Sequence, residues 1–294
     1  MIRFGLNTFL VSSGFTDNDL PLLQEFKRYG ADVIELAIVD PSAVSVDTLK
    51  AALKENDLEQ PVVCGAFGGG RDLRGTTAQR EACIQYIREL IHLANELGAK
   101  VVCGPFYSET GRSGPHTEEE REIQFEQIAE ALRPLCKEAE SLGIMLAMEP
   151  LNRFETDCIN TLEQAVEMIE RVGSPALKIH IDTFHMQIEE ADSSKAILQA
   201  GNHIGHVHAS ASHRGLLGRD QVDWMGVLGA LQEIGYAGDI VIESFSKDNT
   251  VIARAASIWR DLYDSPAQLA VEGLAFLRSN WKVLDRQEEA VVNA

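Results

Sequence analysis

The chain alternates between short apolar runs and longer segments in which apolar residues recur every three or four positions. Runs that are rich in Val, Ile, Leu or Met and bounded by loop residues are typical of buried β-strands. We therefore expect eight strands, near residues 2–7, 33–38, 61–66, 100–104, 144–149, 177–182, 204–208 and 239–243.

The segments between these runs have the spacing of amphipathic helices. In one of them Ile84, Ile87 and Ile91 lie on a shared helix face, and Gly98 follows at the end of the segment. Glycine in this position is typical of a left-handed helix C-cap, and most of the other predicted helices also end on glycine. The pattern therefore predicts that a helix follows each strand.

Eight strands that alternate with helices predict a parallel (β/α)₈ barrel, a TIM barrel, rather than an open doubly wound sheet. The 294 residues fit a single domain of this kind, since such barrels commonly have about 250 residues. We expect the barrel to span residues 1–280 and a C-terminal tail, or packing arm, to span 281–294.

Four of the predicted strands end on a side chain that can bind a hard metal ion: Glu149, Asp182, His208 and Glu243. The C-terminal ends of barrel strands converge on one face, so these side chains should surround a common pocket. Three carboxylates and an imidazole suit a divalent cation, and Mn²⁺ fits best, with Co²⁺ or Mg²⁺ as alternatives. Burying them unpaired would cost several kcal/mol, which a shared cation would offset.

Each of these residues also has a simpler interpretation when it is taken alone. A lone Asp or Glu at a strand end is more often a helix N-cap or a solvated loop residue. We expect only one of His206 and His208 to face inward, with the other packed or on the surface, and we expect His180 to be a core histidine. The metal hypothesis therefore depends on four strands sharing the feature.

Charge limits the partners of the chain. There are 45 acidic and 26 basic residues, which gives a formal net charge of −19. Because phosphate binding relies on clustered Lys and Arg, we expect neither nucleic acid nor a membrane surface as a partner. No apolar run approaches the roughly 20 residues that span a bilayer, and the N-terminus lacks the pattern of a signal peptide.

The cysteines indicate a reducing compartment. The five cysteines are odd in number and form no CxxC pair, which argues against a disulfide framework and a structural zinc site. We therefore expect a cytoplasmic location. Cys64 and Cys103 each end an apolar run, and we interpret them as buried structural thiols rather than nucleophiles.

Longer motifs around the strand ends resemble those of the ketose 3-epimerases, the D-tagatose 3-epimerase and D-psicose (D-allulose) 3-epimerase group of xylose-isomerase-like TIM barrels. The resemblance covers nearly the whole barrel. Its specific segments are MEPLNRFETD (148–157), HIDTFHM (180–186), VHASASHRG (207–215) with VDW (222–224), and GYAGDIVIESF (235–245).

The resemblance implies a metal-dependent epimerase that interconverts C3 epimers of free ketoses of the D-tagatose, D-psicose or L-ribulose type. It assigns Glu149, Asp182, His208 and Glu243 as metal ligands and Glu149 and Glu243 as the acid/base pair. The chemistry requires such a pair, because a proton must leave one face of the carbon and another must return to the opposite face. A Lewis acid would stabilise the intervening cis-enediolate. A homo-oligomer, either a dimer or a tetramer, is expected from the resemblance alone.

The resemblance also places Glu155, His185 and Arg214 at substrate-binding positions, where they would hydrogen-bond the sugar oxygens. A loop ion pair is the simpler alternative for Glu155 and Arg214, and a packed residue at a helix start is the simpler alternative for His185.

The loop after His208 departs from the family pattern. A glutamate three residues beyond the ligand and a PGxG turn are common there. This chain instead has Ala211, with His213 before the arginine, and Leu217 and Asp220 in the turn. We therefore expect the choice of sugar, more than the metal chemistry, to differ.

Two enzymatic alternatives share an enediolate-forming site: an aldose–ketose isomerase, and a lyase that acts on a keto-sugar or keto-glycoside. A DNA-repair endonuclease is disfavoured by the negative charge and by the lack of a basic, aromatic-interleaved patch. A non-catalytic sugar-binding or regulatory barrel is the remaining class.

Overall fold

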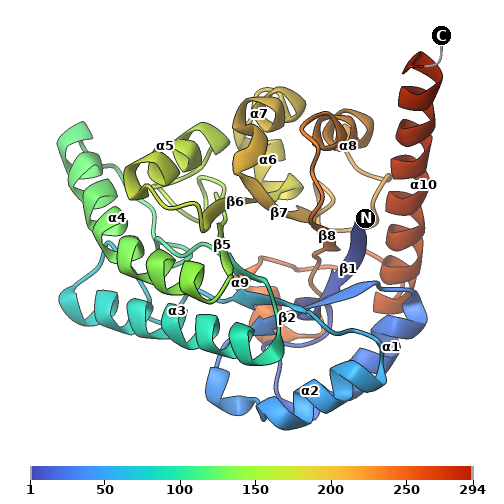
Figure 1. Ribbon diagram of the computed structural model, residues 1–294, viewed down its shortest axis with the longest axis horizontal. Helices are drawn as coiled ribbons and strands as arrows, with labels where there is room; N and C mark the ends of the chain where they lie inside the picture. Colours follow the sequence, from blue (N-terminus) through green and yellow to red (C-terminus); the bar gives the residue numbers. More distant parts are fainter. Residues whose placement is uncertain (1, 293–294) are drawn as a thin grey trace.

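The computed structural model describes the backbone of residues 2–292 and the side chains of residues 2–284. Within this part of the chain, eight parallel strands form a closed barrel in sequence order, and β1 pairs with β8 (Figure 1). The predicted barrel is confirmed. The strands are β1 (Arg3–Asn7), β2 (Val33–Ile38), β3 (Val62–Gly65), β4 (Val101–Gly104), β5 (Met145–Met148), β6 (Leu177–Asp182), β7 (Ile204–Ala209) and β8 (Asp239–Ile242).

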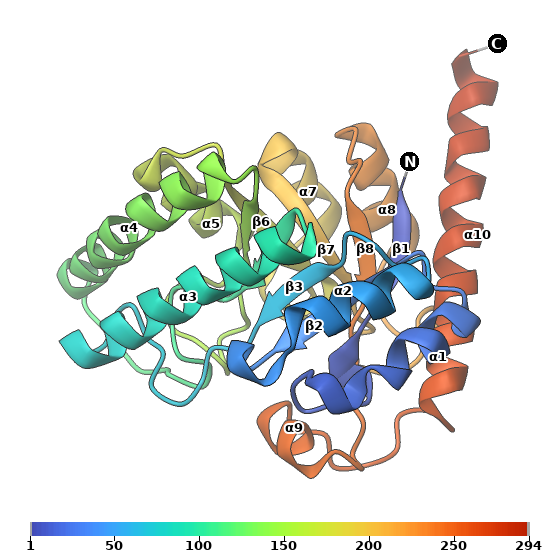
Figure 2. The same cartoon turned by 60° about the horizontal axis from the view of Figure 1, so that its bottom comes forward.

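Helices surround the barrel and connect its strands, and α10 runs along its side and projects beyond it (Figure 2). The α-helices are α1 (Pro21–Tyr29), α2 (Val46–Glu55), α3 (Thr77–Leu97), α4 (Glu118–Ser141), α5 (Leu162–Val172), α6 (Thr183–Glu189), α7 (Ser193–Ala200), α8 (Trp224–Glu233), α9 (Thr250–Ala255) and α10 (Pro266–Val292). Short 3₁₀ segments cover Thr8–Leu10, Asp17–Asp19, Pro41–Ala43 and Gly201–His203.

The helix ends follow from local sequence. α3, α4 and α5 each begin with a capping box, in which a threonine and a Gln or Glu three residues later satisfy each other's backbone N–H groups. Gly98 closes α3 with a φ of 74°, as predicted. α10 continues through residue 281, where we expect the tail to begin, and Trp281 packs against the core. Residues 293–294 of that expected tail lie outside the described residues.

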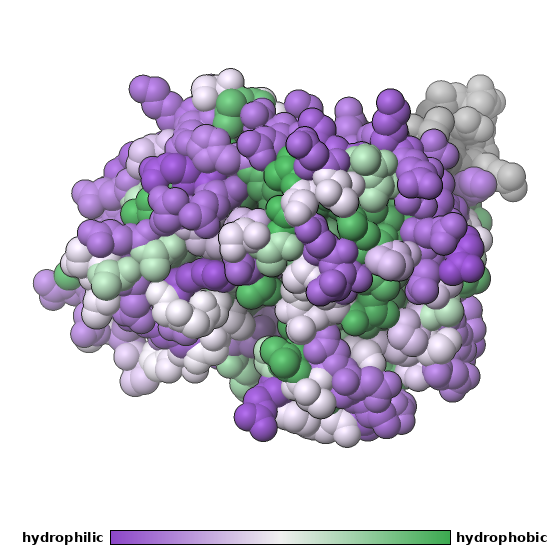
Figure 3. Space-filling view, turned by 90° about the horizontal axis from the view of Figure 1, so that it is seen from below, coloured by the Kyte–Doolittle hydropathy of each residue, from purple (hydrophilic) through white to green (hydrophobic). Residues whose placement is uncertain are grey.

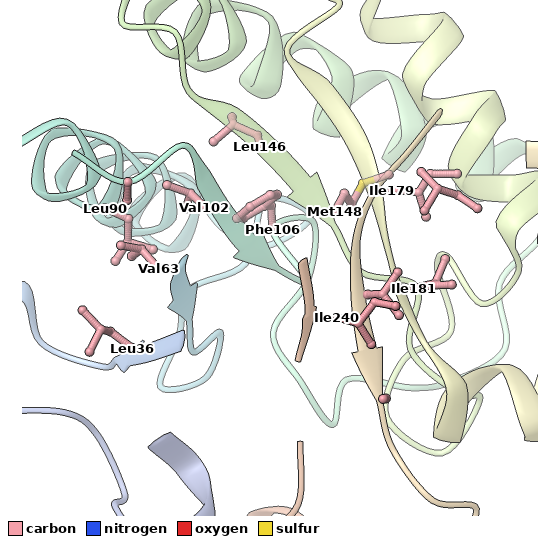
Figure 4. Packing of buried hydrophobic residues seen from close by; sticks show 14 of the residues in the cluster. Leu36, Val63, Leu90, Val102, Phe106, Leu146, Met148, Ile179, Ile181 and Ile240 are labelled. Atoms are coloured by element: carbon pink, nitrogen blue, oxygen red, sulfur yellow. The ribbon is translucent and has the colours of Figure 1, made fainter. Parts of the chain in front are cut away.

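The strands bury both faces. Outward-facing residues of the strands pack under the helices; Figure 4 shows part of this layer, including Leu36, Val63, Val102 and Ile240. The inward-facing residues alternate with them. Many are small, such as Ala37, and several are polar. The barrel is therefore a packed structure with polar side chains at its centre.

Gly5 of β1 lies opposite Val33 of β2, where there is no room for a side chain. A Cβ atom at this position would lie 2.5 Å from Val33 Cγ1 and 2.6 Å from the Val33 carbonyl oxygen. We expect Gly5→Ala to lower the free energy of unfolding by about 1–3 kcal/mol, because the backbone cannot yield without disturbing the sheet. Urea unfolding would measure this loss. Gly114→Ala is the control, since nothing lies within 4 Å of its Cβ position; an equal loss in both variants would contradict the close approach.

One face of the molecule is largely hydrophilic. Figure 3 shows a face on which hydrophilic residues predominate around smaller groups of hydrophobic ones. Over the described residues, the helices are too short or too polar to cross a membrane.

Candidate metal centre

The structure brings together the four residues predicted at the strand ends. Glu149 directly follows β5, Asp182 ends β6, His208 lies in β7 and Glu243 directly follows β8. One potential ligand atom from each lies within 4.8 Å of the others. All four side chains are buried, and the most exposed residues of the set, Glu149 and Glu243, are 7% accessible. The cluster therefore concentrates three carboxylates in a site that is largely shielded from water.

The donor set fits a divalent cation. His208 Nδ1 lies 3.5 Å from Glu243 Oε2 and 3.7 Å from Asp182 Oδ2, and it has no hydrogen-bond partner. A buried ring nitrogen without a partner is costly, and a cation would satisfy it. Three carboxylates would supply the negative charge that a divalent ion requires. These residues therefore have the composition and spacing of a metal site.

Asp182 has two roles that the sequence presents as alternatives. Its Oδ1 accepts hydrogen bonds from the Phe184 and His185 backbone N–H groups, at 2.6 and 3.4 Å, and so caps α6. Its Oδ2 faces the carboxylate cluster. The N-cap interpretation and the ligand interpretation are compatible, because each uses a different oxygen.

Arg214 enters the same cluster. Its Nη1 lies 2.8 Å from Asp182 Oδ2, 2.8 Å from Ser210 Oγ and 2.9 Å from Glu243 Oε2. Its backbone is left-handed, with a φ of 61°, which is rare for a residue with a side chain. The Ser244 hydroxyl donates to the Arg214 carbonyl at 2.6 Å. The loop after β7 is thus held in a strained conformation that directs a buried guanidinium at two of the carboxylates.

Burial and the neighbouring charged groups shift the pKa values of the carboxyl groups in the cluster. Burial raises the pKa of Glu149 well above its ordinary value, and the Glu243 and Asp182 carboxylates reinforce this rise. Burial alone would raise the pKa of Asp182, but Arg214 and His208 hold it well below its ordinary value. The surrounding groups therefore shift the pKa values of these two carboxyl groups in opposite directions.

The prediction that only one of His206 and His208 faces inward is wrong. Residues two apart on a strand point to the same face, so both rings lie inside the barrel. Both residues are fully buried, and the Nε2 atom of each lies 2.6 Å from Glu35. His180 is also fully buried, as expected for a core histidine.

Glu35 was not among the residues predicted from the sequence. It lies in β2, within the run VIELAI, and is fully buried. A charged residue inside an otherwise apolar strand is the signal that could have identified it, since buried carboxylates are almost always paired. Asn7, which ends β1 and donates to Glu35 Oε1 at 2.6 Å, was also not predicted.

The three expected substrate-binding residues lie around the cluster. His185 Nε2 is 3.8 Å from Glu149 Oε1 and 3.4 Å from Arg214 Nη2. Asn152 connects His185 to Glu155. Its backbone N–H donates to His185 Nδ1 at 3.1 Å, and its Nδ2 donates to Glu155 Oε1 at 2.8 Å. Glu155 is part-exposed and bonds to Asn152 rather than to the carboxylate cluster.

The loop after β7, which departs from the family pattern, is stabilised by hydrogen bonds to Asp220 and by burial of Leu217. Asp220 accepts hydrogen bonds from Trp224 Nε1 at 3.0 Å and from the Val222 and Gly218 backbone N–H groups at 2.7 and 2.9 Å. Leu217 is buried in the core. Asp220 and Leu217 thus stabilise a turn in which they replace the last Gly and the Pro of the PGxG pattern, while Gly218 is kept. Ala211 is buried and His213 is half-buried beside it.

All five cysteines are free and buried, as expected for structural thiols. Cys64 and Cys103 are paired in register on β3 and β4. Burial raises the pKa of Cys103 well above its ordinary value, which disfavours the nucleophilic thiolate.

Comparison with known proteins is consistent with this geometry. Residues 23–280 match the sequence model of the family described as xylose isomerase-like TIM barrel. The chain is 31% identical to the L-ribulose 3-epimerase of Mesorhizobium japonicum, over 99% of this chain and 98% of that protein. It is 34% identical to the ketose 3-epimerase of Arthrobacter globiformis, over 87% and 88% of the two chains.

The backbone is also similar to that of a solved epimerase structure. The D-allulose 3-epimerase from Methylomonas sp., in complex with D-allulose, superposes with a TM-score of 0.88. The two chains are 29% identical, and the match covers 95% of this chain and 97% of that one.

Proposed function

The chain belongs to the ketose 3-epimerases of the xylose isomerase-like TIM barrel family and is an isomerase, and on this premise we propose that it interconverts the C3 epimers of free ketoses at a divalent metal site. The observation that carries the proposal is the convergence of Glu149, Asp182, His208 and Glu243 on one buried site. These four residues would hold the metal. When bound, the cation would act as a Lewis acid on the substrate carbonyl and favour formation of the cis-enediolate.

Glu149 and Glu243 are proposed as the two acid/base groups. They follow β5 and β8, and β6 and β7 lie between those strands on one side of the barrel, so the two carboxylates reach the site from different directions. One carboxylate removes the C3 proton from one face, and the other carboxyl group returns a proton to the opposite face.

His185 and Arg214 are proposed to bind the sugar. His185 Nδ1 accepts a hydrogen bond from the Asn152 backbone, so in the neutral ring the proton lies on Nε2. This donor faces Arg214 Nη2, which is also a donor, at 3.4 Å. A substrate hydroxyl or carbonyl oxygen placed between them would accept from both. Glu155, which Asn152 connects to His185, is proposed as a further contact to the sugar hydroxyls.

The direct test is an assay of metal-reconstituted protein. After chelation and reloading with Mn²⁺, Co²⁺ or Mg²⁺, the protein would be incubated with D-fructose, D-psicose, D-tagatose, L-ribulose or D-xylulose in D₂O and the products analysed by NMR. We expect a C3 epimer that carries deuterium at C3, with the highest activity for Mn²⁺. An aldose product would favour the isomerase alternative and an eliminated product the lyase alternative. Metal-loaded protein that is inert on every ketose would favour a non-catalytic sugar-binding barrel.

The proposal includes the surroundings in which the enzyme works. Five buried free thiols support a reducing, cytoplasmic location. The negative net charge supports a small-molecule substrate over nucleic acid or a membrane surface. We also propose a homo-oligomer, a dimer or a tetramer, which light scattering on the purified protein would test.

A further inference from the structure

We infer that Glu35, at the centre of the barrel, is a positioning residue that sets which nitrogen of His208 binds the metal. The inference rests on the proposed metal site, and it concerns a residue that touches neither the metal nor the sugar. Its basis is a buried hydrogen-bond network beneath the four candidate ligands. The network joins Glu35 to His208 and to a second histidine, His206.

The geometry of His208 leaves each ring nitrogen one role. Nε2 lies 2.6 Å from Glu35 Oε1, and Nδ1 faces the Asp182 and Glu243 carboxylates. Glu35 Oε1 also accepts from Asn7 Nδ2 at 2.6 Å, so this oxygen acts as an acceptor and His208 Nε2 is the donor. Nδ1 is then free to offer its lone pair to the cation. A carboxylate behind a metal-binding histidine fixes its tautomer and ring orientation and raises its basicity.

Glu35 is the shared acceptor of this network. It is fully buried. It accepts from His208, from His206 Nε2 at 2.6 Å and from Asn7 Nδ2 at 2.6 Å. Three donors offset the cost of placing a carboxylate inside the barrel.

The orientation of the Asn7 amide determines which way a glutamine side chain at position 35 should point. The Asn7 amide is oriented by the Phe9 backbone N–H, which donates to its Oδ1 at 2.7 Å, so Nδ2 is the group that faces Glu35 Oε1. That is also the oxygen that His208 contacts. In Glu35→Gln the amide oxygen should therefore take this place and keep the His208 tautomer. The amide nitrogen would face His206, which can change tautomer without effect on the metal site.

A second metal ion would be the other use for this cluster. Glu35, Cys103, His206 and His208 also have potential ligand atoms within 4.8 Å of one another. However, the two distances from Glu35 oxygens to ring nitrogens are those of hydrogen bonds, and Asn7 donates to the same carboxylate. The hydrogen-bond network already satisfies the carboxylate, so we assign it a positioning role.

The test compares Mn²⁺ affinity, measured from the EPR signal of the free ion, in Glu35→Leu, Glu35→Gln and His206→Gln. Glu35→Leu should weaken Mn²⁺ binding by roughly 10- to 100-fold, the usual effect of losing such a partner. Glu35→Gln should remain close to the wild type. His206→Gln is the matched control, since His206 is as buried as His208 and bonds to the same carboxylate at the same distance; it should also bind Mn²⁺ normally. Equal losses in Glu35→Leu and His206→Gln would show a merely structural role and overturn the inference.

A measurement on the unmodified sequence keeps the inference testable if Glu35→Leu does not fold. In ¹⁵N-histidine-labelled protein loaded with Mg²⁺ or Zn²⁺, the His208 proton should reside on Nε2. A proton on Nδ1 would overturn the inference. Protein that binds Mn²⁺ but converts no ketose would instead contradict the proposed function, while the Mn²⁺ comparison would still decide the role of Glu35.

Discussion

Replacing Glu149 or Glu243 by glutamine is expected to abolish epimerisation and to leave the fold intact. General acid–base groups contribute roughly 10²- to 10⁴-fold each, and these residues are also candidate metal ligands, so the loss in kcat should reach or exceed the upper end of that range. Glutamine keeps the volume and most of the polarity of glutamate. The circular dichroism spectrum should therefore match that of the wild type.

If the two carboxylates act on opposite faces of the substrate, each single variant should also keep a specific partial reaction. With one base removed, the remaining carboxylate can still exchange the C3 proton of the epimer that presents this proton to it. At saturating Mn²⁺, Glu149→Gln should catalyse hydrogen–deuterium exchange at C3 of one epimer, and Glu243→Gln should do so with the other. Neither variant should convert one epimer into the other. Proton NMR in D₂O would follow both processes in the same sample.

Controls separate this mechanism from a general effect of charge. Glu167→Gln, a surface carboxylate paired with Arg121, should keep full activity. The double variant Glu149→Gln/Glu243→Gln should lose exchange with both epimers. Either single variant with near-wild-type epimerisation would refute the two-base assignment, and so would exchange of the same epimer by both.

The sequence predicts the scaffold well, because the scaffold depends on local signals. Every end of the eight predicted strands lies within one residue of the observed end, and Gly98 closes α3 as expected. The candidate metal site was predictable for a related reason. In a parallel barrel all strands end on one face, so polar residues at the ends of apolar runs, such as Asp182 and Glu243, are expected to lie near one another.

Other features depend on contacts that a linear pattern does not contain. Glu35 lies in an apolar run, and its role appears only when β2 and β7 face each other across the barrel. The inward orientation of both His206 and His208 follows from strand geometry and was mispredicted. The left-handed backbone of Arg214 depends on the turn to Ala211 and on the Ser244 hydroxyl, which lies in a different loop.

Arg214→Met is expected to make the stability of the fold depend strongly on the metal. Arg214 is buried and donates through one nitrogen to Asp182 and to Glu243. Methionine would fill part of the space but leave both carboxylates without this cation. Removing one partner of a buried ion pair commonly costs about 3–5 kcal/mol. We therefore expect a loss of this size in the free energy of unfolding when the protein is kept in EDTA.

Saturating Mn²⁺ should recover much of that loss, because a divalent cation held by the same carboxylates replaces the missing positive charge and stabilises the folded state by mass action. Urea unfolding of the wild type and the variant, each in EDTA and in Mn²⁺, would measure both effects. Arg71→Met is the matched control: this part-buried arginine donates to the Ala66 and Val39 carbonyl oxygens instead of to carboxylates. Its loss should be smaller and the same with and without Mn²⁺. If Arg214→Met were equally unstable in both conditions, the guanidinium would be a packing element and not a counter-charge to the metal-binding carboxylates.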